Sequence, residues 1–411
     1  MVYKKNIYLL LGFGISNREV YKFLKNKRKK CIIFDDKIKK KNIINNIAEI
    51  PFTIIKTLMV SPGTNPMHPL VMKAKMLNIP IKIDIDLLYE YRRKKDLFIG
   101  VTGSNGKTTV VEMISHLLPL PHLLCGNIGV SVLKKCPTYK GYRIYIMEIS
   151  SFQLHYLHSM KFYIGLINNI HPNHDEWHGG FENYKKDKMK LIDFSINKKN
   201  YEGDGKWISK GSIIYRNHIP FLTIYNKCLQ TPHNSKNLCG ALDLLEDIFS
   251  FFHLSFSSHS FIEKINSFAL SPLRQEIIYQ YKNLSIINDS KSTSIHSTIA
   301  AIKAFIGQKI LLMMGGEIKG DLKDLKELLS LIDRIIIFGS SSSLIENFLQ
   351  ENKFLYYEKC EKLSYWVPNT TYEGVILFSP GGASFDEFKN YKHRGNFFNE
   401  KYKKLLPILT Q

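Results

Sequence analysis

The sequence predicts an α/β protein made of three consecutive domains with parallel sheets, and three observations support this. Short apolar runs alternate with longer amphipathic segments along the chain, a pattern typical of strand–helix units with parallel strands. The chain has 411 residues, which is enough for two or three domains of ordinary size. No repeat of roughly 20–50 residues is visible, which excludes solenoids and propellers.

The first block, residues 1–93, is predicted to be a Rossmann-like domain with strands at 6–11, 31–34 and 57–60 and a helix at 16–25. Its first apolar run is short, contains glycines and lacks a small-residue cleavage site, so it indicates a buried strand rather than a secretion signal. The charged stretch YRRKKD then marks a boundary.

The second block, 94–270, is predicted to be a domain of the P-loop ATPase type. The third block, 271–411, is predicted to be Rossmann-like again. An irregular polar region is expected over 197–231, followed by a helix that begins near Asn234. The remaining predicted strands are 97–102, 144–149, 163–168, 284–287, 310–314, 334–338 and 375–378.

Charge is the unusual feature of the composition. The chain has 57 Lys and Arg against 36 Asp and Glu, which gives a net charge of +21. Such a charge is compatible with a protein that binds nucleic acid, a membrane surface or anionic metabolites. Overuse of Lys, Asn and Ile favours compositional bias as the main cause. The six cysteines form no C-x-x-C pair, which predicts a reducing, cytoplasmic location without a zinc or redox site. No run approaches the roughly 20 apolar residues of a membrane helix.

A glycine-rich loop between a predicted strand and a predicted helix carries the strongest signal. Glycines let backbone N–H groups converge on phosphate oxygens, and the helix N-terminus adds partial positive charge. The lysine of G-K-T-T can reach the β- and γ-phosphates, and the next threonine can bind Mg²⁺. Val101 stands where the usual pattern has its first glycine. The predicted ATP-binding residues of the loop are Gly103, Ser104, Asn105, Gly106, Lys107, Thr108 and Thr109.

Glu148 ends a neighbouring strand, where a carboxylate is well placed to hold Mg²⁺. Its segment E-I-S-S-F-Q-L and the loop T-G-S-N-G-K-T-T together resemble the Mur ligases, the ATP-dependent amide ligases of peptidoglycan precursor synthesis. Folylpolyglutamate synthetases have a similar loop. The resemblance extends from residue 9 to residue 395 and is poor over 197–230. It implies that Glu148 and Thr108 hold magnesium.

The resemblance implies two further metal ligands. In N-N-I-H-P-N-H-D-E, the family pattern N-[IV]-x-x-D-H-x-D aligns its histidine with His174, with departures at Asn173 and Glu176. The family also has a lysine carbamylated by CO₂ four residues after a tyrosine. That spacing gives Lys188, with Lys186 as the fallback. Carbamylation needs a neutral amine, hence a depressed lysine pKa, and a cation to hold the anionic product.

Three more motifs resemble nucleotide-binding segments of the family. T-P-H-N-S-K-N implies that Asn234 and Asn237 approach the adenine, although an asparagine here is also typical of a helix N-cap. P-L-R-Q-E implies that Arg274 reaches the phosphates, with Leu273 in place of the family's histidine. In N-D-S-K-S-T, the residues implied at the nucleotide are Asp289 and Lys291, with Thr293 near the amino acid.

The N-terminal block resembles the UDP-sugar pocket of the family. G-F-G-I-S-N follows the first strand and lacks the third glycine of a dinucleotide-binding motif. An acidic residue ends the second strand, where Rossmann-like sites bind ribose. The UDP-substrate-binding residues implied are Gly14, Ile15, Ser16, Asp35, Ser61, Asn127, Ser150 and Gln153.

The C-terminal block resembles the branch of the family that adds D-glutamate. S-P-G-G-A-S-F-D-E-F-K-N-Y-K-H-R-G matches the signature of that branch, and G-G-E-I-K matches the segment whose lysine binds the carboxylate of the amino acid. The D-N-P-R motif of the diamino-acid-adding branch is absent. The D-glutamate-binding residues implied are Thr293, Lys319, Ser384, Phe385 and Tyr391.

The resemblance as a whole implies a cytoplasmic, monomeric, ADP-forming ligase. It would join D-glutamate to UDP-N-acetylmuramoyl-L-alanine through an acyl phosphate, with ATP as third substrate. Mg²⁺ at two sites and a lysine carbamate are the implied cofactors, and neither nucleic acid nor membrane is an expected partner. The implied catalytic residues are Lys107, Glu148, His174 and Lys188, with the third domain closing over them.

Three other functions stay open at this point. One is a sister ligase that adds a different amino acid, including the folylpolyglutamate type. Another is a basic P-loop NTPase acting on nucleic acid, although no clustered aromatic–basic platform for single strands is visible. The third is a degraded homologue that only binds ligands. The presence of Lys107, Glu148, His174 and Asp289 argues against this alternative.

Overall fold

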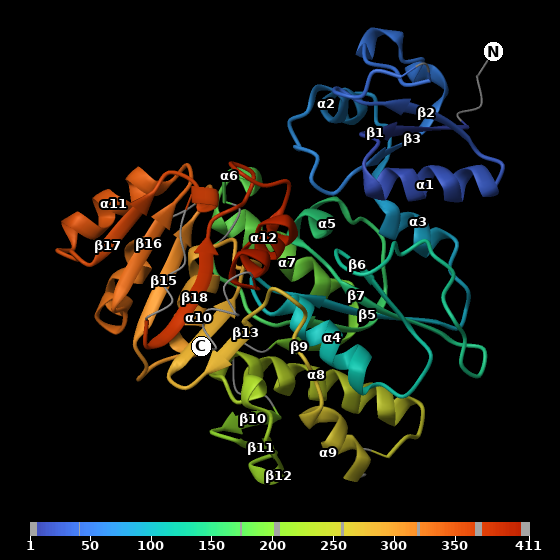
Figure 1. The fold of residues 1–411 in the computed structure, drawn as a ribbon. Coiled ribbons are helices and arrows are strands. Elements are labelled where there is room, and N and C mark those ends of the chain that lie inside the picture. The colour runs from blue at the N-terminus through green and yellow to red at the C-terminus, as the bar shows by residue number, and fades with distance from the viewer. Residues whose placement is uncertain are drawn as a thin grey trace. The chain divides into compact units, whose positions relative to one another are not determined.

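The computed structural model describes residues 6–40, 42–172, 175–200, 206–255, 259–318, 321–365 and 372–403. The chain divides into two compact units (Figure 1): unit 1 is Met1–Tyr225 with Asn234–Ser267, and unit 2 is Asn226–His233 with Phe268–Gln411. Each unit is built on parallel sheets, so the α/β fold class is confirmed. The finer division into three domains stays a prediction.

The N-terminal sheet of unit 1 has four parallel strands in the order β2-β1-β3-β4. The chain leaves β1 for one neighbour and later returns to the other, so the carboxyl ends of β1 and β3 meet where α/β proteins bind ligands. Its strands are β1 Ile7–Leu11, β2 Lys30–Phe34, β3 Ile55–Val60 and β4 Ile81–Lys82, and its helices are α1 Ile15–Asn26, α2 Pro69–Met76 and α3 Asp84–Glu90.

The central sheet of unit 1 has five parallel strands in the order β6-β7-β5-β8-β9. β5 and β7 are apolar almost throughout and buried, as expected for parallel strands covered on both faces. β5 lies between β7 and β8, so the three segments that follow these strands emerge side by side. The strands are β5 Asp96–Thr102, β6 Leu123–Gly126, β7 Arg143–Glu148, β8 Phe162–Ile167 and β9 Ser195–Asn200.

The helices of this part of unit 1 begin close to the predicted positions. α4 starts directly at the end of the glycine-rich loop, and α8 confirms the helix predicted near Asn234, with its first residue at Pro232. They are α4 Lys107–Leu117, α5 Ser151–Tyr156, α6 Asp175–His178, α7 Phe181–Asp193, α8 Pro232–Phe251 and α9 His259–Asn266. In the described part of the chain, no helix combines the length and apolar character needed to cross a membrane.

The prediction of an irregular region over 197–231 is wrong. β9 extends into it, and three short antiparallel strands follow: β10 Trp207–Lys210, β11 Ile213–Arg216 and β12 Ile219–Thr223. Each strand has only four or five residues, and turns at Gly211 and Asn217 separate the strands, so the segment lacks the pattern of the buried parallel strands. Buried Trp207 anchors the small sheet, and its indole N–H donates to Glu246 of α8 at 3.0 Å.

Unit 2 contains one six-stranded sheet in the order β13-β14-β18-β15-β16-β17 (Figure 1). Only β13 runs antiparallel to its neighbour within this sheet. Its strands are β13 Glu276–Tyr281, β14 Leu284–Asn288, β15 Ile310–Gly315, β16 Arg334–Phe338, β17 Tyr357–Cys360 and β18 Gly374–Gly381. Its helices are α10 Ile295–Lys303, α11 Ser342–Glu351 and α12 Tyr391–Lys403. The 3₁₀ turns among the described residues of both units are Ile47–Glu49, Phe52–Ile54, Lys227–Leu229, Lys323–Leu331 and Leu363–Tyr365.

Candidate active site

The loop between β5 and α4 wraps around a lysine ammonium. Lys107 Nζ donates to the carbonyl oxygens of Gly103 at 2.7 Å and Ser104 at 2.9 Å. Gly106 precedes α4 with φ of +78°, a left-handed conformation that suits glycine. The loop therefore combines a fixed cation with the N-terminus of an 11-residue helix, which is the arrangement that binds phosphate.

Asparagine side chains hold this loop from outside. Asn168 Nδ2 donates to Asn105 O at 3.1 Å and to Asn237 Oδ1 at 2.8 Å, and Asn169 Oδ1 accepts from Asn105 N at 2.8 Å. Sequence reasoning did not assign a role to Asn168 and Asn169, although an N-N pair directly after β8, beside the loop, was a usable signal. Asn237 is a second support of the loop, and Asn234 Oδ1 lies 3.4 Å from its Nδ2.

Gly106→Ala is expected to distort the loop and to displace the two asparagine side chains that support it. A Cβ there would lie 2.2 Å from Asn237 Oδ1 and 2.5 Å from Asn168 Nδ2, in addition to the about 1–2 kcal/mol of left-handed backbone strain. Gly211→Ala is the matched control, because Gly211 also has a positive φ of +59° but nothing within 4 Å. Thermal unfolding and ATP-analogue binding should show a larger loss for Gly106→Ala. Equal losses in the two variants would contradict a packing role for Gly106.

The ends of β7 and α4 bring together buried oxygen atoms. Thr108 Oγ1 donates to Glu148 Oε2 at 2.8 Å, and Asn127 Nδ2 donates to Glu148 Oε1 at 2.8 Å. Glu148 is 2% exposed. A hydroxyl and a carboxylate side by side are the hard oxygen ligands that Mg²⁺ prefers, so this donor set fits the predicted metal. Asn127, predicted to bind the UDP substrate, thus lies directly against the candidate metal ligand.

Lys188 lies buried behind the loop, whereas Lys186 is exposed. Lys188 Nζ donates to Gly103 O at 2.8 Å and lies 4.8 Å from the centre of the Tyr184 ring. Burial lowers the pKa of Lys188 well below its ordinary value. The nearby Lys107 charge lowers it further, and Glu148 offsets part of that fall. A neutral amine is what reaction with CO₂ requires, so the structure favours Lys188 over Lys186.

The other residue predicted as a metal ligand, His174, lies outside the described residues, as does Asn173. The side chain of Glu176 is also outside them, although its backbone belongs to α6.

Ser104, from the loop, bonds through its hydroxyl to Tyr184 at 2.8 Å and to His171 O at 2.9 Å. Tyr184 therefore joins α7 to the phosphate loop, a role that sequence reasoning had not given it.

At the N-terminal sheet, the glycine-rich turn after β1 adjoins the end of β3. A Cβ on Gly12 would lie 3.5 Å from Ser61 Oγ, which places Ser61 beside the turn that leads to Gly14 and Ile15. Gly14 and Ile15 are both exposed, and Ser16 Oγ donates to Asp84 Oδ2 at 3.0 Å. The predicted UDP-binding residues of this block thus gather at the carboxyl edge of the sheet.

Asp35 organises that edge through backbone contacts. Its carboxylate accepts from the N–H groups of Phe13 at 2.8 Å, Ile38 at 2.8 Å and Lys37 at 2.9 Å. Burial raises the pKa of Asp35, but these bonds outweigh burial and bring it below its usual value. The side chain therefore fixes the shape of the two turns, in addition to the ribose or uracil contact that the sequence predicts.

Two further predicted UDP-substrate residues form a helix cap. Ser150 Oγ accepts from Gln153 N at 3.2 Å, and Gln153 Oε1 accepts from Ser150 N at 2.9 Å, which is the reciprocal capping box of α5. Gln153 is buried. Both side chains thus fix the start of α5, two residues after Glu148.

In unit 2, Arg274 belongs to a compact polar group. Gln275 N donates to Asp289 Oδ1 at 3.1 Å, and Gln275 Nε2 lies 3.3 Å from His233 Nε2. Burial and the positive charge of Arg274 lower the pKa of His233 to about 4. Leu273, which replaces the family's histidine, is buried and adopts a φ of +65°. The motif thus forms a tight turn that fixes Arg274 beside Asp289.

Asp289→Asn is expected to alter how stability depends on pH. The carboxyl is buried, and burial raises its pKa to about 6, although Ser292 and Ser379 donate to it. The folded chain therefore holds this proton more tightly than the unfolded chain does. As the pH rises from about 4 to about 6, the contribution of this carboxyl to the free energy of unfolding decreases by at most about 3 kcal/mol. Chemical denaturation of wild type and variant at pH 4, 5 and 6.5 should show the variant gaining relative stability as pH rises. A constant difference would contradict the raised pKa.

Some of the residues predicted to bind D-glutamate lie on neighbouring segments of unit 2. Glu317 and Ala383 exchange backbone hydrogen bonds at 2.8 and 2.9 Å, which brings the segment before Lys319 next to buried Ser384. Lys319 itself lies outside the described residues. Lys291 Nζ lies 5.9 Å from the Tyr391 ring centre. Thr293 and Phe385 are exposed, Phe385 to 69%.

Comparison with known proteins identifies the family of this chain. The family described as Mur ligase middle domain matches residues 101–202. The UDP-N-acetylmuramoylalanine–D-glutamate ligase of Francisella tularensis strain SCHU S4 is 30% identical, with 95% of this chain and 94% of that one covered. The enzyme of the same name from Fervidobacterium nodosum is 28% identical, with 97% and 99% covered.

Solved structures share the fold. UDP-N-acetylmuramate–alanine ligase from Thermotoga maritima superposes with a TM-score of 0.61 at 16% identity, over 97% of this chain and 99% of that one. MurF ligase from the same organism, in complex with ADP, gives 0.55 at 17% identity, over 98% and 96%. With its phosphate loop, its buried acid and lysine, and relatives that match from end to end, the chain belongs to the Mur ligase family of ATP-dependent amide ligases.

Proposed function

We propose that the chain joins D-glutamate to UDP-N-acetylmuramoyl-L-alanine and converts ATP to ADP and phosphate in peptidoglycan precursor synthesis. The names of relatives that match nearly the full length support this assignment. The observation that carries the chemistry is the packing of Lys107, Lys188 and Glu148 around one loop: Lys107 and Lys188 both donate to Gly103 O, and Glu148 accepts from Thr108.

The reaction proceeds in two transfers. The muramoyl-alanine carboxylate attacks the γ-phosphorus of ATP, and ADP leaves, which gives an acyl phosphate. The amine of D-glutamate then attacks the acyl carbon, loses a proton and expels phosphate, so an amide forms. Such transfers depend mainly on positioning and on charge neutralisation. Lys107 and the N–H groups of the loop hold the phosphates and stabilise the charge that develops on them.

Thr108 and Glu148 are the described residues whose oxygens would hold Mg²⁺. When bound, the ion polarises the phosphate oxygens and neutralises their charge. Lys188 extends this ligand set once its neutral amine attacks CO₂ and loses a proton, because the carbamate so formed is an anion. We assign the carbamate to Lys188, and this carbamate, Glu148 and His174 are the groups that would hold a second Mg²⁺.

The substrate sites follow the predicted assignments. The turn after β1, with Ser16, Asp35 and Ser61, takes the UDP moiety, and the tight turn at Arg274 takes part in nucleotide binding. The unit-2 group at Lys319, Ser384 and Tyr391 takes D-glutamate. A cytoplasmic monomer is the form proposed.

Amino-acid profiling tests the specificity. With ATP and UDP-N-acetylmuramoyl-L-alanine supplied, phosphate release should depend on D-glutamate and should be weak with L-glutamate, L-alanine or L-lysine. Mass spectrometry should find a product heavier by one glutamyl residue. Faster turnover with another amino acid would contradict the D-glutamate assignment and favour a sister ligase.

A further inference from the structure

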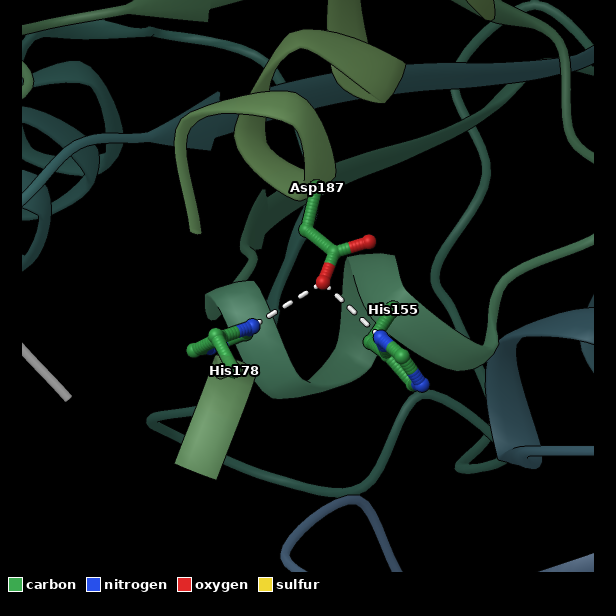
Figure 2. A group of neighbouring side chains, drawn as sticks. All are labelled: His155, His178 and Asp187. Atoms are coloured by element: carbon green, nitrogen blue, oxygen red, sulfur yellow. Dashed lines mark hydrogen bonds and ion pairs between the residues drawn. The ribbon is translucent and has the colours of Figure 1, made fainter. Parts of the chain in front are cut away.

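A largely buried chain of polar side chains lies beside Lys188 and joins three helices of unit 1. Figure 2 shows the Asp187 carboxylate between two imidazole rings: Oδ2 lies 2.8 Å from His155 Nδ1 and 2.9 Å from His178 Nδ1. On its other side, His178 Nε2 lies 3.0 Å from Ser151 Oγ. These residues come from α5, α6 and α7.

The donors and acceptors of this chain are complementary. A carboxylate can only accept, so His178 Nδ1 carries the proton of its bond to Asp187, and the Ser151 hydroxyl, which can donate or accept, pairs with Nε2. The Asp187 carboxylate pairs with His155 and His178 through Oδ2 and with the Lys190 ammonium through Oδ1. His178 and Ser151 are themselves buried. A hydrogen-bonded polar chain whose central members are buried fixes the positions of those members.

The members of the chain are close in sequence to the three proposed metal ligands. Ser151 follows Glu148 by three residues, His178 follows His174 by four, and Asp187 directly precedes Lys188. His178 therefore bonds at one nitrogen to the segment that carries Glu148 and at the other to the segment that carries Lys188.

His178 also supports Lys188 through packing. Its ring centre lies 5.3 Å from that of Tyr184, whose hydroxyl bonds to Ser104 of the phosphate loop and whose ring lies 4.8 Å from Lys188 Nζ. From these contacts we propose that His178 is a positioning residue that sets the spacing of the three metal-binding segments. This inference rests on the proposed function.

Two histidines and an aspartate are also a donor set that transition metals use. The arrangement favours the hydrogen-bonded interpretation, because the Lys190 ammonium lies 2.9 Å from Asp187 Oδ1 and is held there by Leu154 O and His155 O. A fixed positive charge at that distance opposes a cation on the same carboxylate.

The test measures metal binding without turnover. With saturating ADP, Mn²⁺ titration followed by electron paramagnetic resonance should show a dissociation constant raised about 10- to 100-fold in His178→Phe. His178→Asn keeps a donor towards Asp187 and should recover part of the loss. His122→Phe is the matched control: His122 also bonds at both nitrogens, to Ser115 at 2.7 Å and Leu120 O at 2.7 Å, away from the proposed ligands.

A second readout is the carbamate carbon signal in ¹³C NMR after addition of ¹³C-bicarbonate. This signal should be weaker in His178→Phe, absent in Lys188→Met and unchanged in His122→Phe. If His178→Phe does not fold, as judged by circular dichroism, His178→Asn provides both measurements.

Unchanged Mn²⁺ affinity in the His178 variants, or no Mn²⁺ binding by the wild type, would overturn the proposal. So would Co²⁺ binding that both His155→Gln and His178→Phe abolish, because that result would identify the cluster as a metal site. None of these readouts requires ligation. An enzyme inactive towards D-glutamate would therefore refute the proposed function separately.

Discussion

Lys107→Ala is expected to reduce ADP formation by on the order of 10³-fold or more. Lys107 provides the cation inside the phosphate loop, where its Nζ donates to Gly103 O and Ser104 O. Phosphoryl transfer relies on such a charge because negative charge builds up on the transferring group. Stability should change little, because the substitution removes a positive charge near Lys188 rather than a packed apolar side chain. A coupled assay for ADP measures the first effect, and thermal unfolding measures the second.

Lys134→Ala is a suitable control for that substitution. Lys134 is half exposed and pairs with Glu19 at 3.0 Å on the N-terminal part of the chain, so it tests the effect of losing one surface charge. Its activity should equal that of the wild type. If Lys107→Ala keeps more than a tenth of the wild-type rate, the assignment of the loop as the ATP site is wrong.

Lys188→Ala should also eliminate activity, for a different reason. This side chain is 1% exposed, and its proposed carbamate supplies an anionic ligand that alanine cannot replace. Alanine also leaves a cavity, which costs about 2–5 kcal/mol for side chains of this size. Lys188→Met keeps the unbranched stem without the amine, so its activity loss can be assigned to the missing nitrogen. Steady-state rates in buffers depleted of CO₂ and then resupplied with bicarbonate should rise on resupply in wild type but not in Lys188→Ala or Lys188→Met.

Lys186→Ala is the matched control on the same helix. Lys186 is exposed and lies two residues from Lys188, so its loss should leave both the rate and the bicarbonate response intact. Normal activity in Lys188→Met, or loss of activity in Lys186→Ala, would move the carbamate away from Lys188.

The sequence predicted the main parts of the fold because the buried parallel strands are nearly continuous apolar runs. β5, β7 and β18 lie where such runs were found, and the phosphate loop follows β5 as expected. Strands β10, β11 and β12 were missed because they are short and half polar, and the burial of Trp207 depends on α8, which comes later in the chain.

The choice between two lysines shows what helical spacing could have added. Tyr184, Lys188 and Leu191 are four and then three residues apart, so they share one face of α7, and all three are buried. Lys186 lies on another face. The sequence alone therefore carried a physical reason to favour Lys188, in addition to the resemblance.

The contacts of His178 could not be foreseen in the same way. Its partners, Ser151 and Asp187, lie 27 residues before it and 9 residues after it, and only the packing of α5, α6 and α7 brings them together. Asn168 is a similar case, because its bond to Asn237 joins residues 69 positions apart. Periodicity and motif spacing report local structure, and these bonds depend on tertiary structure.

The central claim, ligation of D-glutamate to a UDP-muramoyl-alanine acceptor driven by ATP, is tested most directly by ADP release with each substrate omitted in turn. ADP should appear at the full rate only when ATP, UDP-N-acetylmuramoyl-L-alanine and D-glutamate are all present. Without the acceptor no acyl phosphate can form, and without the amino acid the acyl phosphate cannot turn over. ADP release that continues unchanged without D-glutamate, or that responds to DNA instead of the acceptor, would contradict the account.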